Sequence, residues 1–151
     1  MQWVARERPK IDRIACPWLV ARFIDKQPEF LYVPGSEVLS VAAATGAIPY
    51  DVPGVELGHH GERCSFDAFI AKYRLDDRPL QQLALIVRAA DCHAPQLAAE
   101  AAGLLAISQG LSLNFTDDQE MLRHGLVMYD ALYAWCAGTP LANDGQLWRG
   151  R

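Results

Sequence analysis

Four successive segments in residues 65–137 repeat apolar side chains at the spacing of an α-helix, and this pattern restricts the fold more than any other feature. The first segment shows the i, i+3, i+4, i+7 stripe of a helix with one buried face: Phe66, Phe69, Ile70 and Tyr73. Each segment carries a start signal, namely Ser65 as N-cap, Asp77 with Pro79, Pro95, and the capping box of residues 116–119. Gly110 is expected to end the third helix, and the fourth is expected to end near residues 136–138. The second half of the chain should therefore be a set of packed helices.

The first half of the chain mixes helical and extended patterns. From residue 11 the apolar spacing is helical, and Pro17 either starts this helix or kinks one that begins at Asp12. Residues 29–33 and 47–50 are typical of short strands, and a short helix is expected over residues 38–45 before Gly46. The predicted fold class is α+β and predominantly helical, with about five to six helices and a small sheet of short strands in the N-terminal half. We expect residues 1–137 to form one domain and residues 138–151 to form a mobile tail.

The charge of the chain is unevenly distributed. Its 14 basic and 18 acidic residues give a net charge of −4, which argues against a domain that binds nucleic acid directly. Residues 1–26, however, hold six basic and three acidic side chains, so this front segment is cationic. No apolar run reaches the roughly 18 residues of a membrane span, and the charged N-terminus does not resemble a secretory signal. We therefore expect a cytoplasmic protein without a membrane association, whose four cysteines are reduced.

The basic front segment is a candidate anion site. Arg6, Arg8 and Lys10 occupy every second position and would share one face of an extended strand, with Arg13 and Arg22 following in the helical pattern. Guanidinium groups form paired hydrogen bonds to planar and tetrahedral oxyanions, so these five residues are candidate ligand-binding residues. The alternative is a solvated strand edge on which the charges prevent aggregation.

The loop of residues 58–64, GHHGERC, is a candidate metal site. His59, His60 and Glu62 offer imidazole and carboxylate ligands for iron, zinc or manganese, and the flanking glycines allow the backbone to bend them together. The alternative is a polar surface turn, because neighbouring residues seldom ligate one ion together. His124 lies on the apolar face of the last helix with Glu120 one turn before it, and both are candidate ligands. A histidine at such a position is also typical of a hydrogen-bonded core residue.

Two further residues are candidate catalytic groups. Asp91 continues the inward stripe of its helix, so it needs a partner, which could be a cation, a metal or Arg88. Cys16 follows Arg13 by about one helical turn, and if Pro17 starts the helix this thiol lies at a helix N-terminus, where a thiolate is favoured. The alternative for Cys16 is a buried structural thiol.

Long stretches of the chain resemble one known family. The stretches are ERPKIDRIACPWLVARFID (residues 7–25), FLYVP (30–34), PYDVPGVELGHHGERCSFDAFI (49–70) and HGLVMYDALYAW (124–135). They resemble the C-terminal domain of the ChrB-type chromate-resistance family, and the likeness extends over nearly the whole chain to about residue 137. Full-length members carry an additional N-terminal half, to which the resemblance assigns DNA binding, and this chain lacks a counterpart of it. The resemblance implies a role in chromate-related stress.

These observations lead to two main functional hypotheses. The first is a module that binds or senses chromate or a similar oxyanion through the basic front segment and the histidine loop. The alternative is a small metal-dependent enzyme, redox or hydrolytic, with a His/Glu/Asp site. A third hypothesis is an interaction domain, in which the charged front docks a partner such as a separate regulator, or a second copy in a homo-oligomer.

Overall fold

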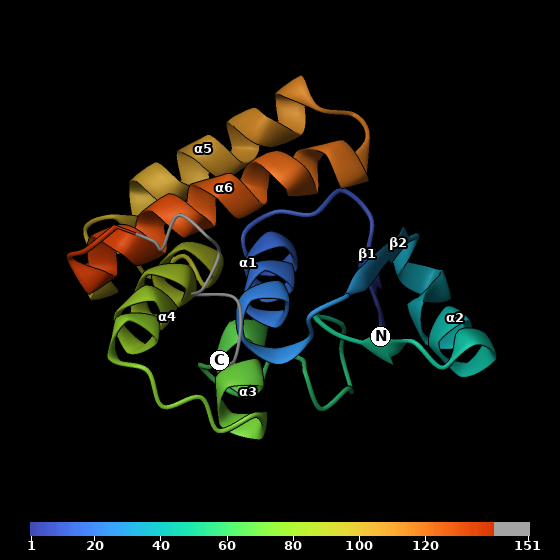
Figure 1. Cartoon of the computed structure of the whole chain (residues 1–151). Helices are drawn as coiled ribbons and strands as arrows, with labels where there is room; N and C mark the ends of the chain where they lie inside the picture. The colour runs from blue at the N-terminus through green and yellow to red at the C-terminus, as the bar shows by residue number, and fades with distance from the viewer. Residues whose placement is uncertain (141–151) are drawn as a thin grey trace.

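The computed structural model of the chain describes residues 1–140. Its strands are β1 (Gln2–Arg6), β2 (Glu29–Val33) and β3 (Ile48–Pro49). Its α-helices are α1 (Asp12–Leu19), α2 (Val38–Thr45), α3 (Ser65–Lys72), α4 (Arg78–Asp91), α5 (Ala101–Asn114) and α6 (Asp118–Ala137). The predicted α+β, predominantly helical class with a small sheet is confirmed (Figure 1). Most of the predicted tail of residues 138–151 lies outside the described residues.

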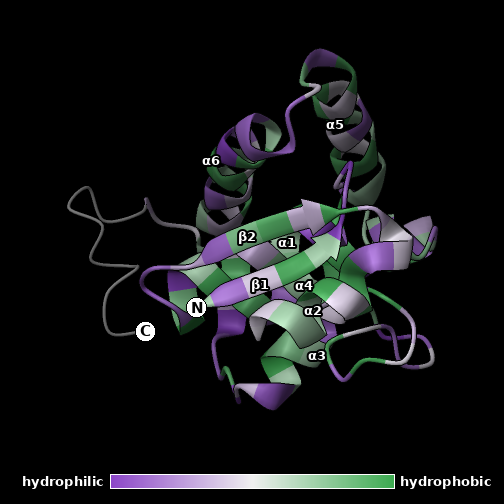
Figure 2. Ribbon diagram, turned by 90° about the vertical axis from the view of Figure 1, so that its right-hand side faces the viewer, coloured by the Kyte–Doolittle hydropathy of each residue, from purple (hydrophilic) through white to green (hydrophobic). Residues whose placement is uncertain are grey.

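The sheet is parallel, with β1 between β2 and β3. Both crossovers pass through a helix, α1 on the way from β1 to β2 and α2 on the way from β2 to β3. Successive side chains of β1 point to opposite faces: Trp3 and Ala5 join the main core, whereas Val4 packs with Val38 of α2 in a smaller cluster. Both faces of β1 are therefore covered, as parallel strands require (Figure 2).

Helix α1 lies at the centre of the molecule, with α3, α4 and α6 packed around it (Figure 1). All of its residues except Arg13 are buried, and Trp18 is enclosed by the rings of Phe23, Tyr129 and Tyr133. Side chains at both ends of α1 thus have fixed surroundings. No helix of residues 1–140 is both long enough and apolar enough to cross a membrane.

Of the two alternatives for the first helix, the structure has the one that begins at Asp12 and contains Pro17. Because proline has no amide hydrogen, the carbonyl oxygen of Arg13 lacks its usual helical donor. The hydroxyl group of Tyr32 on β2 donates to this oxygen at 2.7 Å instead. The helix continues as a π-helical turn over Val20–Ile24. The proline is therefore accommodated by a hydrogen bond from the neighbouring strand.

Two of the predicted caps are wrong by one residue. The N-cap of α3 is Cys64, and the predicted cap Ser65 is the first helical residue. The N-cap of α6 is Asp117, whose carboxylate accepts the amides of Gln119 and Glu120. Adjacent polar residues compete for a cap, and tertiary contacts decide between them.

The third helix was also predicted with the wrong bounds. Pro95 opens only a short 3-10 turn, Pro95–Leu97, and α5 begins six residues later at Ala101. Gly110 lies inside α5, where it has an ordinary helical backbone, so it is not a stop signal. Glycine weakens a helix by only about 1 kcal/mol, and the packing of α5 against α4 and α6 overrides this preference.

Candidate functional site

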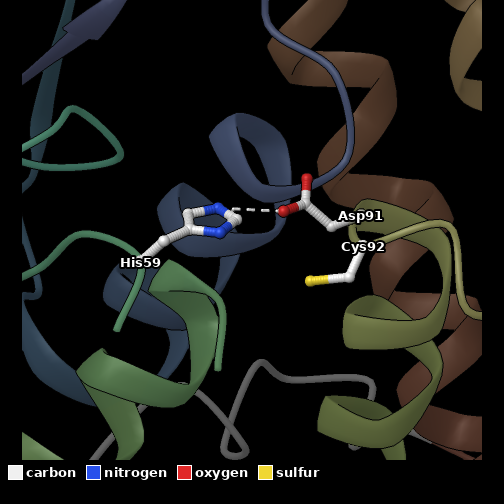
Figure 3. A group of neighbouring side chains, drawn as sticks. All are labelled: His59, Asp91 and Cys92. Carbon is white, nitrogen blue, oxygen red and sulfur yellow. Dashed lines mark ion pairs between the residues drawn. The ribbon is translucent and has the colours of Figure 1, made fainter. Parts of the chain in front are cut away.

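Three aspartate side chains surround the imidazole of His59. Its Nε2 atom lies 3.0 Å from Asp91 Oδ2, 3.2 Å from Asp51 Oδ1 and 3.6 Å from Asp12 Oδ2. Asp12 is the first residue of α1, Asp51 follows β3, Asp91 is the last residue of α4, and His59 lies in the loop before α3. Figure 3 shows the imidazole pointing from its loop toward the end of α4. We call these four residues the His59 cluster.

Local hydrogen bonds hold the cluster in place. Asp12 Oδ2 accepts the backbone amide of Ser65 at 2.8 Å, so the carboxylate caps the start of α3. The hydroxyl group of Ser65 donates to Asp51 Oδ1 at 3.1 Å. Gly58 brings the loop close enough, since a Cβ atom there would lie 2.7 Å from the carbonyl oxygen of Val52. The start of α3 therefore connects two of the aspartates, and a glycine positions the histidine.

The carboxylates of the cluster are in an unfavourable environment for negative charge. Asp12 is fully buried, and burial together with the charges of Asp91 and Asp51 raises its pKa well above the ordinary value. Burial and the charge of Asp51 also raise the pKa of Asp91, against the opposing effect of His59. Oδ1 of Asp12 is buried and has no hydrogen-bond partner among the described residues. The cluster thus has more negative charge than its neighbours compensate.

Two arginines approach the cluster from the sheet side. Arg13 Nε lies 3.3 Å and Arg6 Nη2 lies 3.7 Å from the same oxygen, Asp51 Oδ2. Burial and the charge of Arg6 lower the pKa of Arg13 from its ordinary value. A cavity of about 470 Å³ opens beside them, lined by Arg6, Asp51, Val52, Pro53, Gly54 and His59. We call this cavity the Arg6 pocket.

The remaining basic residues of the front segment do not reach this pocket. The predicted strand face of Arg6, Arg8 and Lys10 is wrong, because β1 ends at Arg6 and Arg8 has a positive φ of 56°. The Arg8 guanidinium instead donates to carbonyl oxygens and to Asp118 at the junction of α5 and α6. Arg22 pairs with Asp130 of α6 at 3.1 Å, and Lys10 is exposed. Of the predicted anion ligands, the structure brings together Arg6 and Arg13.

The predicted metal ligands are also separated. His60 Nε2 faces the carbonyl oxygen of Glu56 at 2.7 Å, and Glu62 is exposed. His124 is exposed on α6, where it stacks on Phe115 and lies 3.5 Å from Glu120, so its predicted place on the apolar face is wrong. Among residues 1–140, the groups of adjacent metal-binding side chains include His59 and Asp91 but none of these four residues.

Asp12 and Asp51 are the members of the His59 cluster that sequence reasoning missed. Asp12 precedes an apolar helical pattern, where an acidic residue is ordinary, and Asp51 follows a strand pattern in a polar loop. Neither position carries a signal of its own. Arg88, a partner considered for Asp91, binds Asp67 of α3 instead, with its Nη2 at 2.7 Å from Oδ1.

The environments of the cysteines change the interpretation of Cys16. This residue lies inside α1 and is fully buried, so the predicted position at a helix N-terminus is wrong. Burial raises the pKa of its thiol well above the ordinary value, which disfavours the nucleophilic thiolate. Cys64 and Cys92 lie beside the His59 cluster, and Cys92 is exposed next to Asp91 (Figure 3).

Fold and site together define a small α+β domain in which a partly buried His–Asp cluster adjoins a pocket lined by Arg6. The profile of the family described as ChrB, C-terminal domain, matches residues 3–136, and the chain belongs to this family. Protein ChrB of Cupriavidus metallidurans is 31% identical over 133 residues, which are 87% of this chain and 40% of that protein. The chain therefore spans less than half the length of this relative. No solved structure matches this chain significantly.

Proposed function

We propose that this domain serves chromate resistance by binding chromate, or a similar tetrahedral dianion, in the Arg6 pocket. Membership in the ChrB family supports a chromate-resistance-associated role. The observation that carries the finer proposal is the position of Arg6, whose side chain is 45% exposed at the cavity and whose ion pair within residues 1–140 is a long 3.7 Å contact with Asp51. A guanidinium group that is held at one end and open to solvent at the other can take up an oxyanion.

The surroundings of Arg6 favour an anion at the mouth of the pocket. His59 lies at the same cavity with its side chain 44% exposed, so its imidazole can donate a second hydrogen bond. Arg13 lies behind Arg6 and compensates the charge of Asp51.

Calorimetric titration with chromate, and with sulfate as a redox-inert dianion of the same shape, tests the proposal. We expect Arg6→Gln to weaken binding of both anions about tenfold or more, because a charge-assisted hydrogen bond contributes about 1.5–3 kcal/mol. The matched control is Arg123→Gln on α6, an exposed arginine that pairs with Glu120. Equal affinity of the Arg6→Gln and Arg123→Gln proteins would exclude the pocket as the site.

The proposal places the domain in the cytoplasm, where thiols stay reduced, and all four cysteines are free. As part of the same proposal, the domain acts together with a docking partner or regulator. The ChrB relative is much longer than this chain, so it contains regions that this chain does not match. The alternative of a small metal-dependent enzyme requires a metal, and the residues that could hold one lie directly beside the Arg6 pocket.

A further inference from the structure

We infer that three carboxylates and one imidazole form a binding site for one divalent transition-metal ion: Asp12, Asp51, Asp91 and His59. This inference goes beyond the proposed oxyanion binding and does not depend on it. The four side chains come from four separate segments of the chain, and the three carboxylates converge on the Nε2 atom of His59. They share His59 and Asp91 with the residues for which the sequence suggested a metal, whereas Asp12 and Asp51 replace His60, Glu62 and His124.

The distances within the cluster are those between ligands of one metal ion. The Nε2 atom of His59 lies 3.0, 3.2 and 3.6 Å from the three carboxylate oxygens. Ligands about 2.1 Å from a common metal are separated by roughly 3.0 Å at octahedral angles and roughly 3.4 Å at tetrahedral angles. Asp12, Asp51 and His59 form one group whose ligand atoms lie within 4.8 Å of one another, and Asp91 joins His59 in a neighbouring group, so binding of one ion by all four residues requires side-chain rotations.

The unpartnered oxygen of Asp12 is an independent sign of a missing ligand. Asp12 is fully buried, and while Oδ2 accepts the Ser65 amide, Oδ1 has no hydrogen-bond partner among residues 1–140. A buried carboxylate oxygen without a partner is strongly destabilising, so such groups are rare in folded proteins. Arg13 and Arg6 do not supply the partner, since both pair with Asp51. A bound cation would satisfy this oxygen.

The donor set restricts the choice of metal. Three carboxylates and one imidazole suit Mn²⁺, Fe²⁺ and Zn²⁺, whereas the soft ion Cu⁺ requires thiolate or thioether ligands. Cys64 and Cys92 lie next to the cluster, and each forms a group of neighbouring potential ligands with Asp91. Binding of Co²⁺ distinguishes a site of carboxylate and imidazole ligands from one that includes a cysteine. A thiolate ligand adds a charge-transfer band to the absorption spectrum, and oxygen and nitrogen ligands do not.

The test is a calorimetric titration of the chelator-treated protein with Mn²⁺ and with Zn²⁺, in the absence of any oxyanion. We expect one ion per chain, and a loss of affinity of tenfold or more in Asp12→Asn and in His59→Gln. His59 is partly exposed and caps no helix, so His59→Gln should fold normally even if Asp12→Asn does not. Circular dichroism of each variant verifies this.

The matched control is the double variant Glu120→Gln with His124→Gln, which removes the other adjacent acid and histidine pair. It should bind the metal as tightly as the unmodified chain. Absence of binding to the unmodified chain, equal affinity of His59→Gln, or a thiolate band with Co²⁺ would each overturn the assignment. The metal titration contains no oxyanion, so a negative result does not bear on the Arg6 pocket. The titration with chromate and sulfate tests that pocket separately.

Discussion

Gly125 allows α6 to approach α1 at the point where α1 carries the His59 cluster. A Cβ atom at this position would lie 2.5 Å from Cγ2 of Ile14, a fully buried side chain two residues after Asp12. Such a contact is far shorter than a van der Waals contact, so the Ile14 side chain or one of the two helices must shift in Gly125→Ala. Gly110 on α5 is the matched control, because a Cβ atom there has no neighbour within 4 Å.

The two substitutions should have opposite effects on the free energy of unfolding. Replacing a helical glycine by alanine stabilises by about 1 kcal/mol, and this is the expected effect of Gly110→Ala. At Gly125 the same gain is opposed by overpacking, which costs about 1–3 kcal/mol in a dense core. We therefore expect Gly125→Ala to be less stable than Gly110→Ala by about 1–3 kcal/mol, or by roughly 2–12 °C in Tm at this chain length.

Urea denaturation, followed by circular dichroism with a shared m-value, measures this difference. The double variant Ile14→Ala with Gly125→Ala adds a second criterion, since the new methyl group fills part of the space that Ile14 leaves. Its loss of stability should be smaller than the sum of the two single losses. Equal stability of Gly125→Ala and Gly110→Ala, or additive losses in the double variant, would refute the close packing of α1 against α6.

Three further predictions concern an ion pair, the cysteines and the metal. Arg88→Met should destabilise the fold by about 1–3 kcal/mol, because it removes the bidentate arginine partner of the buried carboxylate of Asp67 and leaves the amide of Cys64 and the more distant Arg63; denaturation tests this, and an unchanged midpoint contradicts it. Brief alkylation with iodoacetamide near neutral pH should modify the exposed Cys92 before the buried Cys16, as read by peptide mass spectrometry; early labelling of Cys16 would show that α1 is open. Loading with Zn²⁺ should tighten sulfate binding, because a divalent cation offsets most of the carboxylate charge beside the Arg6 pocket; weaker binding in calorimetry would contradict this.

The basic front segment illustrates how far pattern reasoning reaches. Alternation predicted one face for Arg6, Arg8 and Lys10, and it would be correct if β1 continued to residue 10. The strand ends at Arg6, because Arg8 turns into a left-handed conformation and binds the junction of α5 and α6. A contact between residues more than 100 positions apart thus decided the local geometry. Such contacts leave no mark in a local pattern.

The sequence by itself determined the class of the fold and most of its elements. Helical hydrogen bonds join residues four positions apart, so the apolar stripes and the caps of residues 65–137 indicate helices, with errors at their ends that reach six residues at the start of α5. The strand at residues 29–33 and the helix before Gly46 were predicted for the same reason. The sequence also singled out His59 and Asp91, since imidazole and a carboxylate on an inward stripe need partners.

Only the tertiary structure decided which polar groups meet. Asp12 and Asp91 reach His59 because α1 packs against α3 and α4, and Asp51 is connected to them through Ser65; Asp12 and Asp51 look ordinary in their own segments. His60 is adjacent in the chain and yet faces Glu56, while His124 lies exposed on another helix. The physical reason is that secondary structure follows from short-range spacing, whereas a site depends on the packing of distant elements, which no single segment encodes.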